Sequence, residues 1–212
     1  MGKKQKVMAR KLILDEAEKL FSERGYFKVT AKEVSEAAGV NTAAVNYYFG
    51  GKDGLYLEVL KIAHQKMVSE HTLDKILEQK GTAKEKLRCF LEIFIGEKDP
   101  ARKRAFRLFL LEIASPSTLV EQNMQLVAFP KMKKFSVLIS EITGFDAESS
   151  KLMHATGFAL LQSISFMIFP NFFKNMLFGE NFTESSAKEK AQLIDSLTEY
   201  VYGGLEALKK SS

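Results

Sequence analysis

Four residues between positions 42 and 47 carry groups that can read the edges of DNA bases. The side chains of Thr42, Asn46 and Tyr47 can donate and accept hydrogen bonds. The methyl groups of Thr42 and Ala43 can contact the methyl group of a thymine. A helix that presents these four side chains on its outward side can place them in a major groove. We therefore expect Thr42, Ala43, Asn46 and Tyr47 to face bases.

Two short helices joined by a tight turn are predicted to carry these residues, within residues 30–52. Thr30 can cap the first helix with its hydroxyl, and Glu33 completes a capping box. Gly39 suits the position after that helix, where a positive φ costs little only for glycine. Asn41 or Thr42 caps the second helix. The capping box and the polar outward face favour a helix-turn-helix over an ordinary pair of helices whose small residues serve packing alone.

Residues around the second helix can bind phosphates. Gly50-Gly51 ends that helix, and Lys52 follows where a phosphate would lie. We also expect Thr30 and Tyr48 at phosphates. A basic arm at the start of the chain has two readings, a contact with the phosphate backbone or a solvated terminus, and both stay open. Its basic residues are Lys3, Lys4, Lys6, Arg10 and Lys11.

The first quarter of the chain resembles the N-terminal domain of the TetR (tetracycline-repressor) family of bacterial transcription regulators. The matching pieces are ILDEAEKLFSERGYFKVTAKEVSEAAGV and NTAAVNYYFGGKDGLYLEVL. The resemblance implies a DNA-binding domain over residues 1–54 and an effector-binding and dimerisation domain over residues 55–212. It implies a repressor that binds a palindromic operator in double-stranded DNA as a homodimer. It also implies that Tyr26 and Phe27 pack into the core of the small DNA-binding domain. Thr42-Ala43 and Asn46-Tyr47 depart from the pairs that many relatives carry, so the resemblance does not specify the operator sequence.

Composition indicates an all-α globular protein of 212 residues, 46% hydrophobic and 27% charged, with four prolines. The net charge of +5 suits a nucleic-acid binder, although many basic proteins bind none. The single cysteine, Cys89, suits a reducing cytoplasm, either as a small buried hydrophobe or, as the minority reading, as a redox switch. We see no signal peptide and no apolar run long enough to span a bilayer, so we expect a cytoplasmic protein without a membrane partner.

Helices are predicted over most of the remaining chain. Residues 55–79 read as one long connecting helix, while Pro130 should kink or divide the helical stretch that begins at about residue 118. Asp146 should cap a helix over 147–169, and a last helix should cover 186–209. These last two helices are so apolar that we expect a second chain to cover them; the resemblance also implies dimerisation through this pair. The phenylalanine-rich segment 169–182 has three readings, a mobile lid, a membrane-surface patch or a connection packed at the dimer edge, and we favour the connection.

A small apolar or aromatic effector requires a cavity in the C-terminal part of the chain. Methionine and phenylalanine side chains leave adaptable space, and one polar group can orient a ligand. The same residues at helical spacing occur more often as plain core. The candidate lining residues are Met67, Phe90, Phe94, Phe109, Met124, Phe135, Phe158 and Gln162.

Neither catalysis nor a metal site is predicted, and no cofactor is implied. His64, His71 and His154 are scattered, and no HExxH, CxxC or nucleophile-elbow pattern occurs. Two alternatives to an effector-controlled regulator stay open. One is a DNA-binding regulator that responds to a protein partner or to nothing. The other is an enzyme or lipid-binding protein with an accessory helical hairpin.

Overall fold

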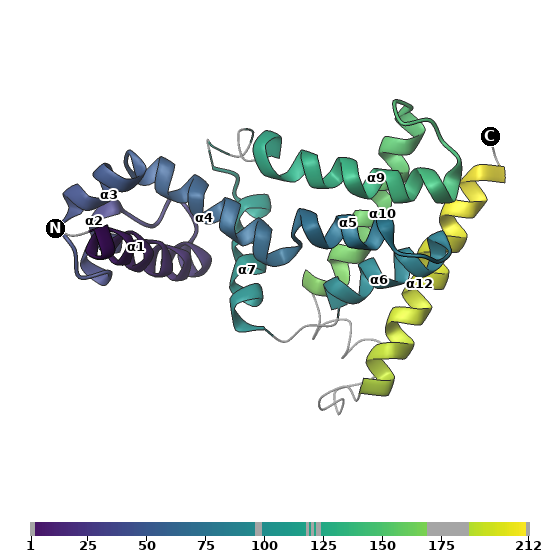
Figure 1. The fold of residues 1–212 in the computed structure, drawn as a ribbon, viewed down its shortest axis with the longest axis horizontal. Helices are drawn as coiled ribbons and strands as arrows, with labels where there is room; N and C mark the ends of the chain where they lie inside the picture. The colour runs from purple at the N-terminus through teal and green to yellow at the C-terminus, as the bar shows by residue number, and fades with distance from the viewer. Residues whose placement is uncertain are drawn as a thin grey trace. The chain divides into compact units, whose positions relative to one another are not determined.

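The structure is a computed structural model that describes residues 3–95, 99–117, 119, 121, 124–168 and 187–210. The described residues form helices, turns and irregular coil and include no strand, so the all-α prediction is confirmed (Figure 1). None of the described helices is long and apolar enough to span a membrane. The helices are α1 (Lys3–Arg24), α2 (Ala31–Ala37), α3 (Thr42–Phe49), α4 (Lys52–Met67), α5 (Glu70–Glu78), α6 (Ala83–Ile95), α7 (Pro100–Ala114), the π-helix η1 (Met124–Ala128), α9 (Phe129–Thr143), α10 (Ser150–Ile168) and α12 (Ala187–Lys210).

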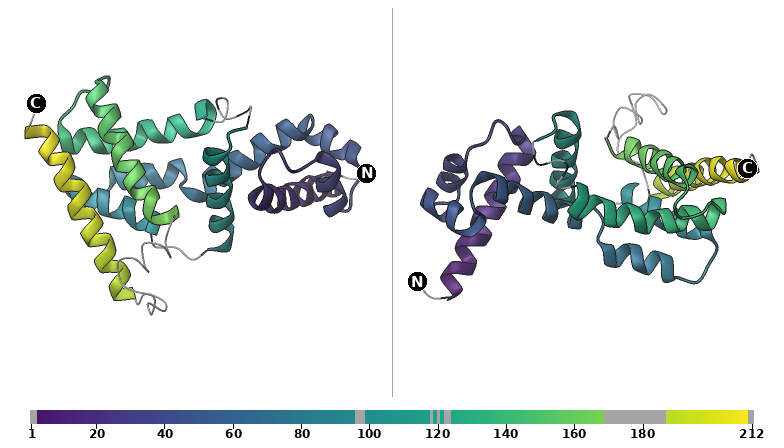
Figure 2. Two further views of the ribbon diagram at one scale, coloured as in Figure 1. Left: turned by 180° about the vertical axis from the view of Figure 1, so that it is seen from behind. Right: turned by 90° about the horizontal axis from the view of Figure 1, so that it is seen from above.

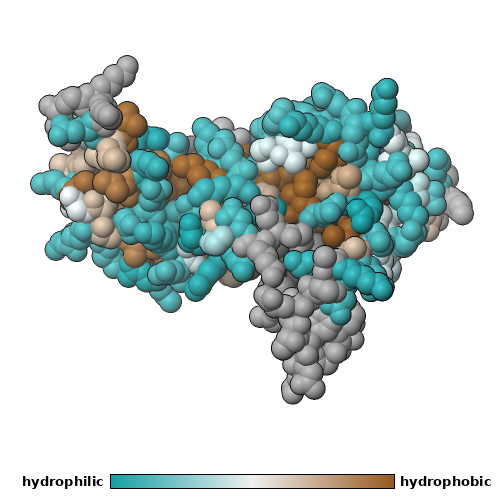
Figure 3. Space-filling view, turned by 60° about the horizontal axis from the view of Figure 1, so that its bottom comes forward, coloured by the Kyte–Doolittle hydropathy of each residue, from teal (hydrophilic) through white to brown (hydrophobic). Residues whose placement is uncertain are grey.

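The chain divides into two compact units, and each is built from two separate segments. The N-terminal unit comprises residues 1–69 and 98–129, and the C-terminal unit comprises residues 70–97 and 130–212. Helix α7 therefore belongs to the N-terminal unit although it follows α5 and α6 in the chain. In each unit, apolar residues form surface patches between hydrophilic ones (Figure 3).

The core of the N-terminal unit forms where α1, α4 and α7 pack together. Ile13 and Phe21 of α1 and Leu55 of α4 are fully buried. The ring of Phe21 meets the ring of Tyr56 edge to face, with 4.8 Å between centroids. Helices α2 and α3 pack on α1 and α4 from outside this core. The three helices α1, α4 and α7 thus form the support on which the α2–α3 pair is held.

The predicted long helix over residues 55–79 is wrong, because it is interrupted between α4 and α5. Val68 adopts an extended conformation, with φ −153° and ψ 124°, and its N–H donates to the carbonyl of His64 to end α4. A β-branched valine followed by a serine resists helix formation, since the valine is restricted at χ1 and the serine competes for backbone hydrogen bonds. The break falls where the chain leaves the N-terminal unit for the C-terminal one.

The C-terminal unit is organised by α6, which packs against α5, α10 and α12. Leu87 and Leu91 of α6 are fully buried, and Ile194 and Leu197 of α12 are nearly so. Helices α10 and α12 lie side by side in the views of Figure 2. Burial of these leucine and isoleucine side chains is the main stabilising contribution, at about 1.5–3 kcal/mol for each fully buried side chain.

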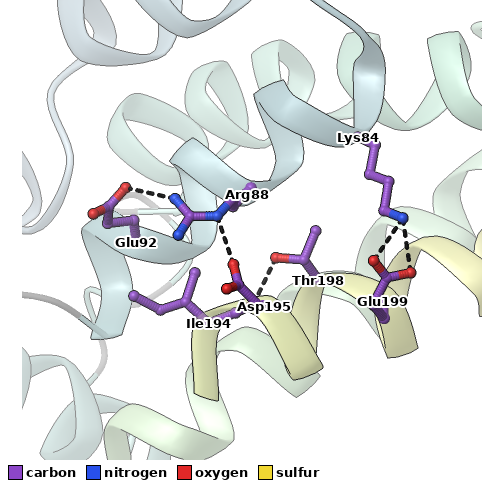
Figure 4. A network of polar contacts seen from close by, with 7 residues as sticks. All are labelled: Lys84, Arg88, Glu92, Ile194, Asp195, Thr198 and Glu199. Carbon is purple, nitrogen blue, oxygen red and sulfur yellow. Dashed lines mark hydrogen bonds and ion pairs between the residues drawn. The ribbon is translucent and has the colours of Figure 1, made fainter. Parts of the chain in front are cut away.

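Exposed ion pairs also join α6 to α12 (Figure 4). The Arg88 Nε donates to the Asp195 Oδ1 over 2.7 Å, and the Lys84 Nζ lies 2.6 Å from the Glu199 Oε1. Both pairs are open to solvent, so each contributes roughly 0–1 kcal/mol. They define how α6 and α12 align rather than the stability of the unit.

Of three further expectations, two differ from the structure. Phe27 was expected in the core of the small domain, but its side chain is 60% exposed. Asp146 does not cap the helix that follows it, because α10 begins at Ser150 and the Ser149 Oγ accepts from the Leu152 N–H over 3.1 Å. The third agrees with it, because the helical stretch is divided beside Pro130: the π-helix η1 ends at Ala128, and Pro130 is the second residue of α9, where its missing N–H is tolerated.

Two other predicted segments cannot be compared fully with the structure. The stretch from residue 118 to the start of η1 is described only at residues 119 and 121, so the helix expected to begin there falls largely outside the described residues. The segment 169–182 lies wholly outside them.

Candidate nucleic-acid interface

The turn between α2 and α3 has the geometry that its sequence predicts. The Thr30 Oγ1 accepts from the Glu33 N–H over 3.2 Å, and the Glu33 Oε2 accepts from the Thr30 N–H over 2.8 Å. After α2, Gly39 adopts a φ of +65°. Its N–H donates to the Glu36 carbonyl, and the Val40 N–H donates to the Ser35 carbonyl, which closes the helix end as a Schellman motif. The capping box and the helix-turn-helix geometry are thus confirmed.

Helix α3 is attached to this support through one side only. Its Val45 is fully buried, and the Asn41 Oδ1 caps its start by accepting from the Ala43 N–H over 2.8 Å. Gly50, with a φ of +73°, ends it. The hydroxyl of Thr42 lies 2.8 Å from the hydroxyl of Ser35 on α2, which links the two helices. The caps and these contacts hold α3 in one orientation and leave its opposite side in solvent.

The outward side of α3 carries three of the four residues expected at bases. Ala43, Asn46 and Tyr47 are exposed, and Tyr47 has 69% of its surface accessible. Within the described residues, no hydrogen bond engages the Asn46 amide, so both its donor and its acceptor groups are available. Thr42 differs, because it is half-buried and its hydroxyl is bonded to Ser35. Of the four, Asn46 and Tyr47 combine exposure with hydrogen-bonding groups.

The residues expected at phosphates differ in how free their polar atoms are. The Thr30 hydroxyl donates to the Glu33 Oε2 over 2.8 Å, so it would have to release this bond in order to donate to a phosphate. Tyr48 is half-buried, and its ring makes an edge contact with Tyr47 at 4.9 Å. The Lys52 Nζ lies 4.0 Å from the ring centroid of Tyr26, a cation–π distance. The aromatic ring holds the ammonium group in a defined place.

Hydrogen bonds to Thr30 set the charge state of Glu33. They lower the pKa of the Glu33 carboxyl, first through the Thr30 hydroxyl and then through the Thr30 backbone N–H, with a smaller contribution from Arg24. Because the hydrogen bonds favour the charged form, the capping carboxylate is ionised at neutral pH.

Two basic residues of the N-terminal segment lie beside α3. Residues from Lys3 onward belong to α1, so this segment is a helix rather than an arm. The Lys6 Nζ lies 3.5 Å from the Tyr47 hydroxyl oxygen. The Arg10 guanidinium lies 5.2 Å from the ring centroid of Phe49 and pairs with Glu58 over 3.0 Å. Lys6 and Arg10 are four positions apart, which places them on one face of a helix. This spacing was the sequence signal that could have distinguished them from the other basic residues of the segment.

The eight residues expected around an effector are divided between the two units. Met67 and Phe109 belong to the N-terminal unit, and Phe90, Phe135, Phe158 and Gln162 belong to the C-terminal unit. The side chains of Phe94 and Met124 lie outside the described part of the structure.

Their surroundings differ as well. Phe90 and Phe135 are buried and stacked, with centroids 4.0 Å apart, and thus fill the core of their unit. Phe158 is 62% exposed on α10. Gln162 is half-buried. Met67 is buried, while Phe109 is half-buried and meets the His64 ring edge to face.

A groove of about 470 Å³ lies between α1 and α4. Leu14 and Val59 form its buried apolar floor. Lys66 at its wall pairs with Glu18 over 2.5 Å. None of the eight residues expected around an effector borders this groove. The described residues contain no cluster of three or more His, Cys, Asp or Glu side chains that could hold a metal ion.

A capped helix-turn-helix with a polar outward face and a lysine just beyond it defines a DNA-binding protein of the helix-turn-helix class. Residues 13–59 match the family model of bacterial regulatory proteins, tetR family. Residues 83–205, more than half of the chain, match the C-terminal domain of the HTH-type transcriptional dual regulator CecR. The chain belongs to the TetR family of bacterial transcriptional regulators.

Individual relatives are distant. The chain is 23% identical over 137 residues to YttP of Bacillus subtilis, named as a probable HTH-type transcriptional regulator, and this match covers 64% of the chain and 65% of YttP. It is 28% identical over 86 residues to the HTH-type transcriptional regulator BetI of Brucella canis, which covers 41% of the chain and 42% of BetI. The matches thus span less than two thirds of the length of these curated relatives.

Solved structures share the fold. The transcriptional regulator FadR from Bacillus subtilis, in complex with stearoyl-CoA, aligns with a TM-score of 0.64 at 16% identity and covers 92% of this chain and 98% of its own. HlyIIR, a hemolysin II transcriptional regulator, aligns with a TM-score of 0.58 at 22% identity, covering 91% of this chain and 98% of its own. At these identities the likeness extends to the fold alone.

Proposed function

We propose that the protein is a homodimeric repressor that binds a palindromic operator and is released from it by a small apolar or aromatic effector. The observation that carries this proposal is the exposed side of α3, where the Asn46 amide has no partner among the described residues while Val45 and the caps hold the helix in place. A helix fixed in this way reads base edges without first having to be ordered. Two copies would read half-sites in successive major grooves.

Residue roles follow from these environments. Asn46 and Tyr47 donate to and accept from base edges, and the methyl groups of Ala43 and Thr42 contact thymine methyl groups. The ammonium groups of Lys52 and Lys6 bind phosphates, as do the remaining residues of the expected set, Thr30 and Tyr48. Arg10 lies beside them and adds positive charge.

Dimerisation is proposed through α10 and α12. Met153, Phe158 and Leu161 expose apolar side chains on α10, and Tyr200 does so on α12. No heavy atom lies within 4 Å of a Cβ built at Gly203 or Gly204 of α12, so a helix of a second chain can approach closely there. Burial of this apolar surface by a second copy would stabilise the pair, and the dimer would set the distance between the two copies of α3.

Effector control is proposed for the part of the chain beyond residue 54, with DNA binding assigned to residues 1–54. An effector releases the dimer from DNA if it binds more tightly to a conformation in which the distance between the two copies of α3 no longer fits the operator. Because FadR of the same fold was solved with stearoyl-CoA, a long-chain acyl-CoA is the first compound to test. A dimer of this kind acts in the cytoplasm, where the chromosome lies.

A second candidate keeps DNA binding but assigns control to a protein partner. The stacked pair of Phe90 and Phe135 favours it, since two of the eight expected effector residues fill the core instead of lining space. Binding of acyl-CoA that DNA weakens, observed in a calorimetric titration of the dimer, would favour the first candidate over the second.

Selection of bound DNA from a random pool tests the proposed function. The purified protein should enrich a palindrome, and sizing of the complex should give two or four chains per site. With that operator, Lys52→Ala should weaken binding to all sequences alike, because a phosphate contact carries no sequence information. Asn46→Ala should change the preferred bases, with about 1–3 kcal/mol lost at the position it reads. Failure to enrich any sequence at low salt would refute the DNA-reading role.

A further inference from the structure

A buried carboxylate on α7 joins two elements of the N-terminal unit. Glu112 is 4% exposed. Its Oε2 accepts from the Tyr56 hydroxyl of α4 over 2.5 Å. Its Oε1 accepts from the Ser117 hydroxyl over 2.6 Å and from the Ser117 N–H over 3.1 Å. Because a buried charge is costly unless hydrogen bonds compensate it, all three donors are needed where they are.

One side of this junction holds the chain that leaves α7. The Ser115 N–H donates to the Leu111 carbonyl and ends the helix. Ser117 is buried, and its Oγ accepts from the Leu119 N–H over 3.2 Å. The hydroxyl of Ser117 thus donates to the Glu112 carboxylate and accepts from the following backbone. A shift of Ser117 would have to break its bonds to the carboxylate.

The other side of the junction leads toward the start of α4. Burial, followed by the hydrogen bond to Glu112, raises the pKa of Tyr56, so its hydroxyl keeps the proton that it donates. The Tyr56 ring lies 4.9 Å from the ring of Tyr26, centroid to centroid. The Tyr26 hydroxyl donates to the Asp53 Oδ1 over 2.6 Å, and the Lys52 Nζ lies 4.0 Å from the Tyr26 ring centroid.

We infer that Glu112 is a positioning residue for DNA binding, which acts through Tyr56 and Tyr26 to hold the ammonium group of Lys52 where a phosphate can reach it. The inference rests on the proposed function, because it presumes that Lys52 binds phosphate. It extends that function to a residue 60 positions further along the chain, which no sequence motif connects with DNA. It also identifies Ser117 as a place where a conformational change alters DNA affinity.

The decisive variant is Glu112→Gln, which keeps the size of the side chain. Glutamine has a single acceptor oxygen and adds two N–H donors, so it cannot accept from both Tyr56 and Ser117. Ser117→Ala is the milder second variant, since the Ser117 N–H can still donate to the carboxylate. Leu108→Val serves as the matched control, because Leu108 is fully buried on the same helix and takes no part in these contacts.

The readout is the dependence of DNA affinity on salt concentration. Each lost phosphate contact lowers the slope of log K against log salt by about 0.9, so Lys52→Ala should lower the slope of a dimer by about 1.8. Glu112→Gln should lower it by part of that amount, and Glu112→Gln combined with Lys52→Ala should have the slope of Lys52→Ala alone. Leu108→Val should keep the wild-type slope even if it loses as much thermal stability as Glu112→Gln.

Two outcomes would overturn the inference. One is a folded Glu112→Gln protein with the wild-type slope; the other is an effect that adds fully to that of Lys52→Ala. Either would reduce Glu112 to a stabilising residue. If Glu112→Gln does not fold, Ser117→Ala is subject to the same criteria.

A measurement without DNA separates this inference from the proposed function. The ε-methylene of Lys52 is bonded to the Nζ that lies over the Tyr26 ring, so it should resonate upfield of other lysines in the NMR spectrum of the free protein. Glu112→Gln should move this signal toward the ordinary lysine position, and Leu108→Val should not. If Glu112→Gln moves the Lys52 signal but the wild-type protein binds no DNA, the proposed function alone is refuted. If Glu112→Gln leaves the Lys52 signal where it is in the wild type, the positioning role alone is refuted.

Discussion

Replacement of Phe135 by alanine tests whether the aromatic residues of the C-terminal unit are core or cavity lining. Phe135 is 3% exposed and stacks on Phe90, with centroids 4.0 Å apart and an interplanar angle of 21°. Removing a buried phenylalanine costs about 3–5 kcal/mol, which includes the cavity left behind. The stack itself accounts for about 0.5–1.5 kcal/mol of this. We expect Phe135→Ala to lower the free energy of unfolding by about 4 kcal/mol.

The assay is urea denaturation followed by circular dichroism at a fixed dimer concentration. Phe90→Ala combined with Phe135→Ala should cost about 1 kcal/mol less than the sum of the single changes, since the stack can be lost only once. Val137→Ala is the control on the same helix; its side chain is 54% exposed, and the cost should stay within about 0.5 kcal/mol. A loss below about 1.5 kcal/mol for Phe135→Ala would show that the ring borders open space and would refute the packing argument.

Three other changes test the caps and the exposed face of α10. Thr30→Ala should cost about 1 kcal/mol in urea denaturation, while Thr30→Ser should cost a few tenths, because only alanine removes the acceptor of the capping box. Hydrogen bonds from Thr30 lower the folded-state pKa of Glu33, so the stability that this carboxylate contributes is present above the ordinary glutamate pKa and is lost as pH falls through the lowered value. The difference in unfolding free energy between wild type and Thr30→Ala should therefore become smaller in acid. Gly50→Ala should cost about 1 kcal/mol, because its φ of +73° disfavours any side chain, and an unchanged melting temperature would contradict this. Phe158→Glu should give monomers in analytical ultracentrifugation, and a dimer that survives would place the interface elsewhere.

Local signals explain why the α2–α3 unit could be predicted in detail. The capping box needs only Thr30 and Glu33, and the Schellman turn needs only a glycine after α2. All of these contacts join residues a few positions apart, where residue type and spacing specify the geometry. The same signals located α3 and the residues on its outward side.

Non-local packing explains what the sequence could not show. Tyr56 and Glu112 are far apart in the chain, and nothing about a tyrosine or a glutamate in an amphipathic helix indicates that they are hydrogen-bonded. The interruption at Val68 has only a weak local signal, since valine occurs within many helices. Phe27 looks like a core residue by type, yet it is Tyr26 whose ring packs against Tyr56 of the core. The exposed Phe27 ring meets the Tyr26 ring edge to face, with 5.2 Å between centroids.

The membership of α7 in the N-terminal unit limits how modular this regulator can be. A hybrid that joined residues 1–54 to the body of another regulator would cut α4 after its third residue, and even a fragment ending at residue 69 would lack α7. In that fragment α4 would lose the packing of α7, and Tyr56 would lose its hydrogen bond to Glu112. Recombination at either of these two positions would thus remove part of the core of the N-terminal unit. A working chimaera has to bring a helix that replaces α7, and a carboxylate at the position of Glu112 would be the first requirement of its design.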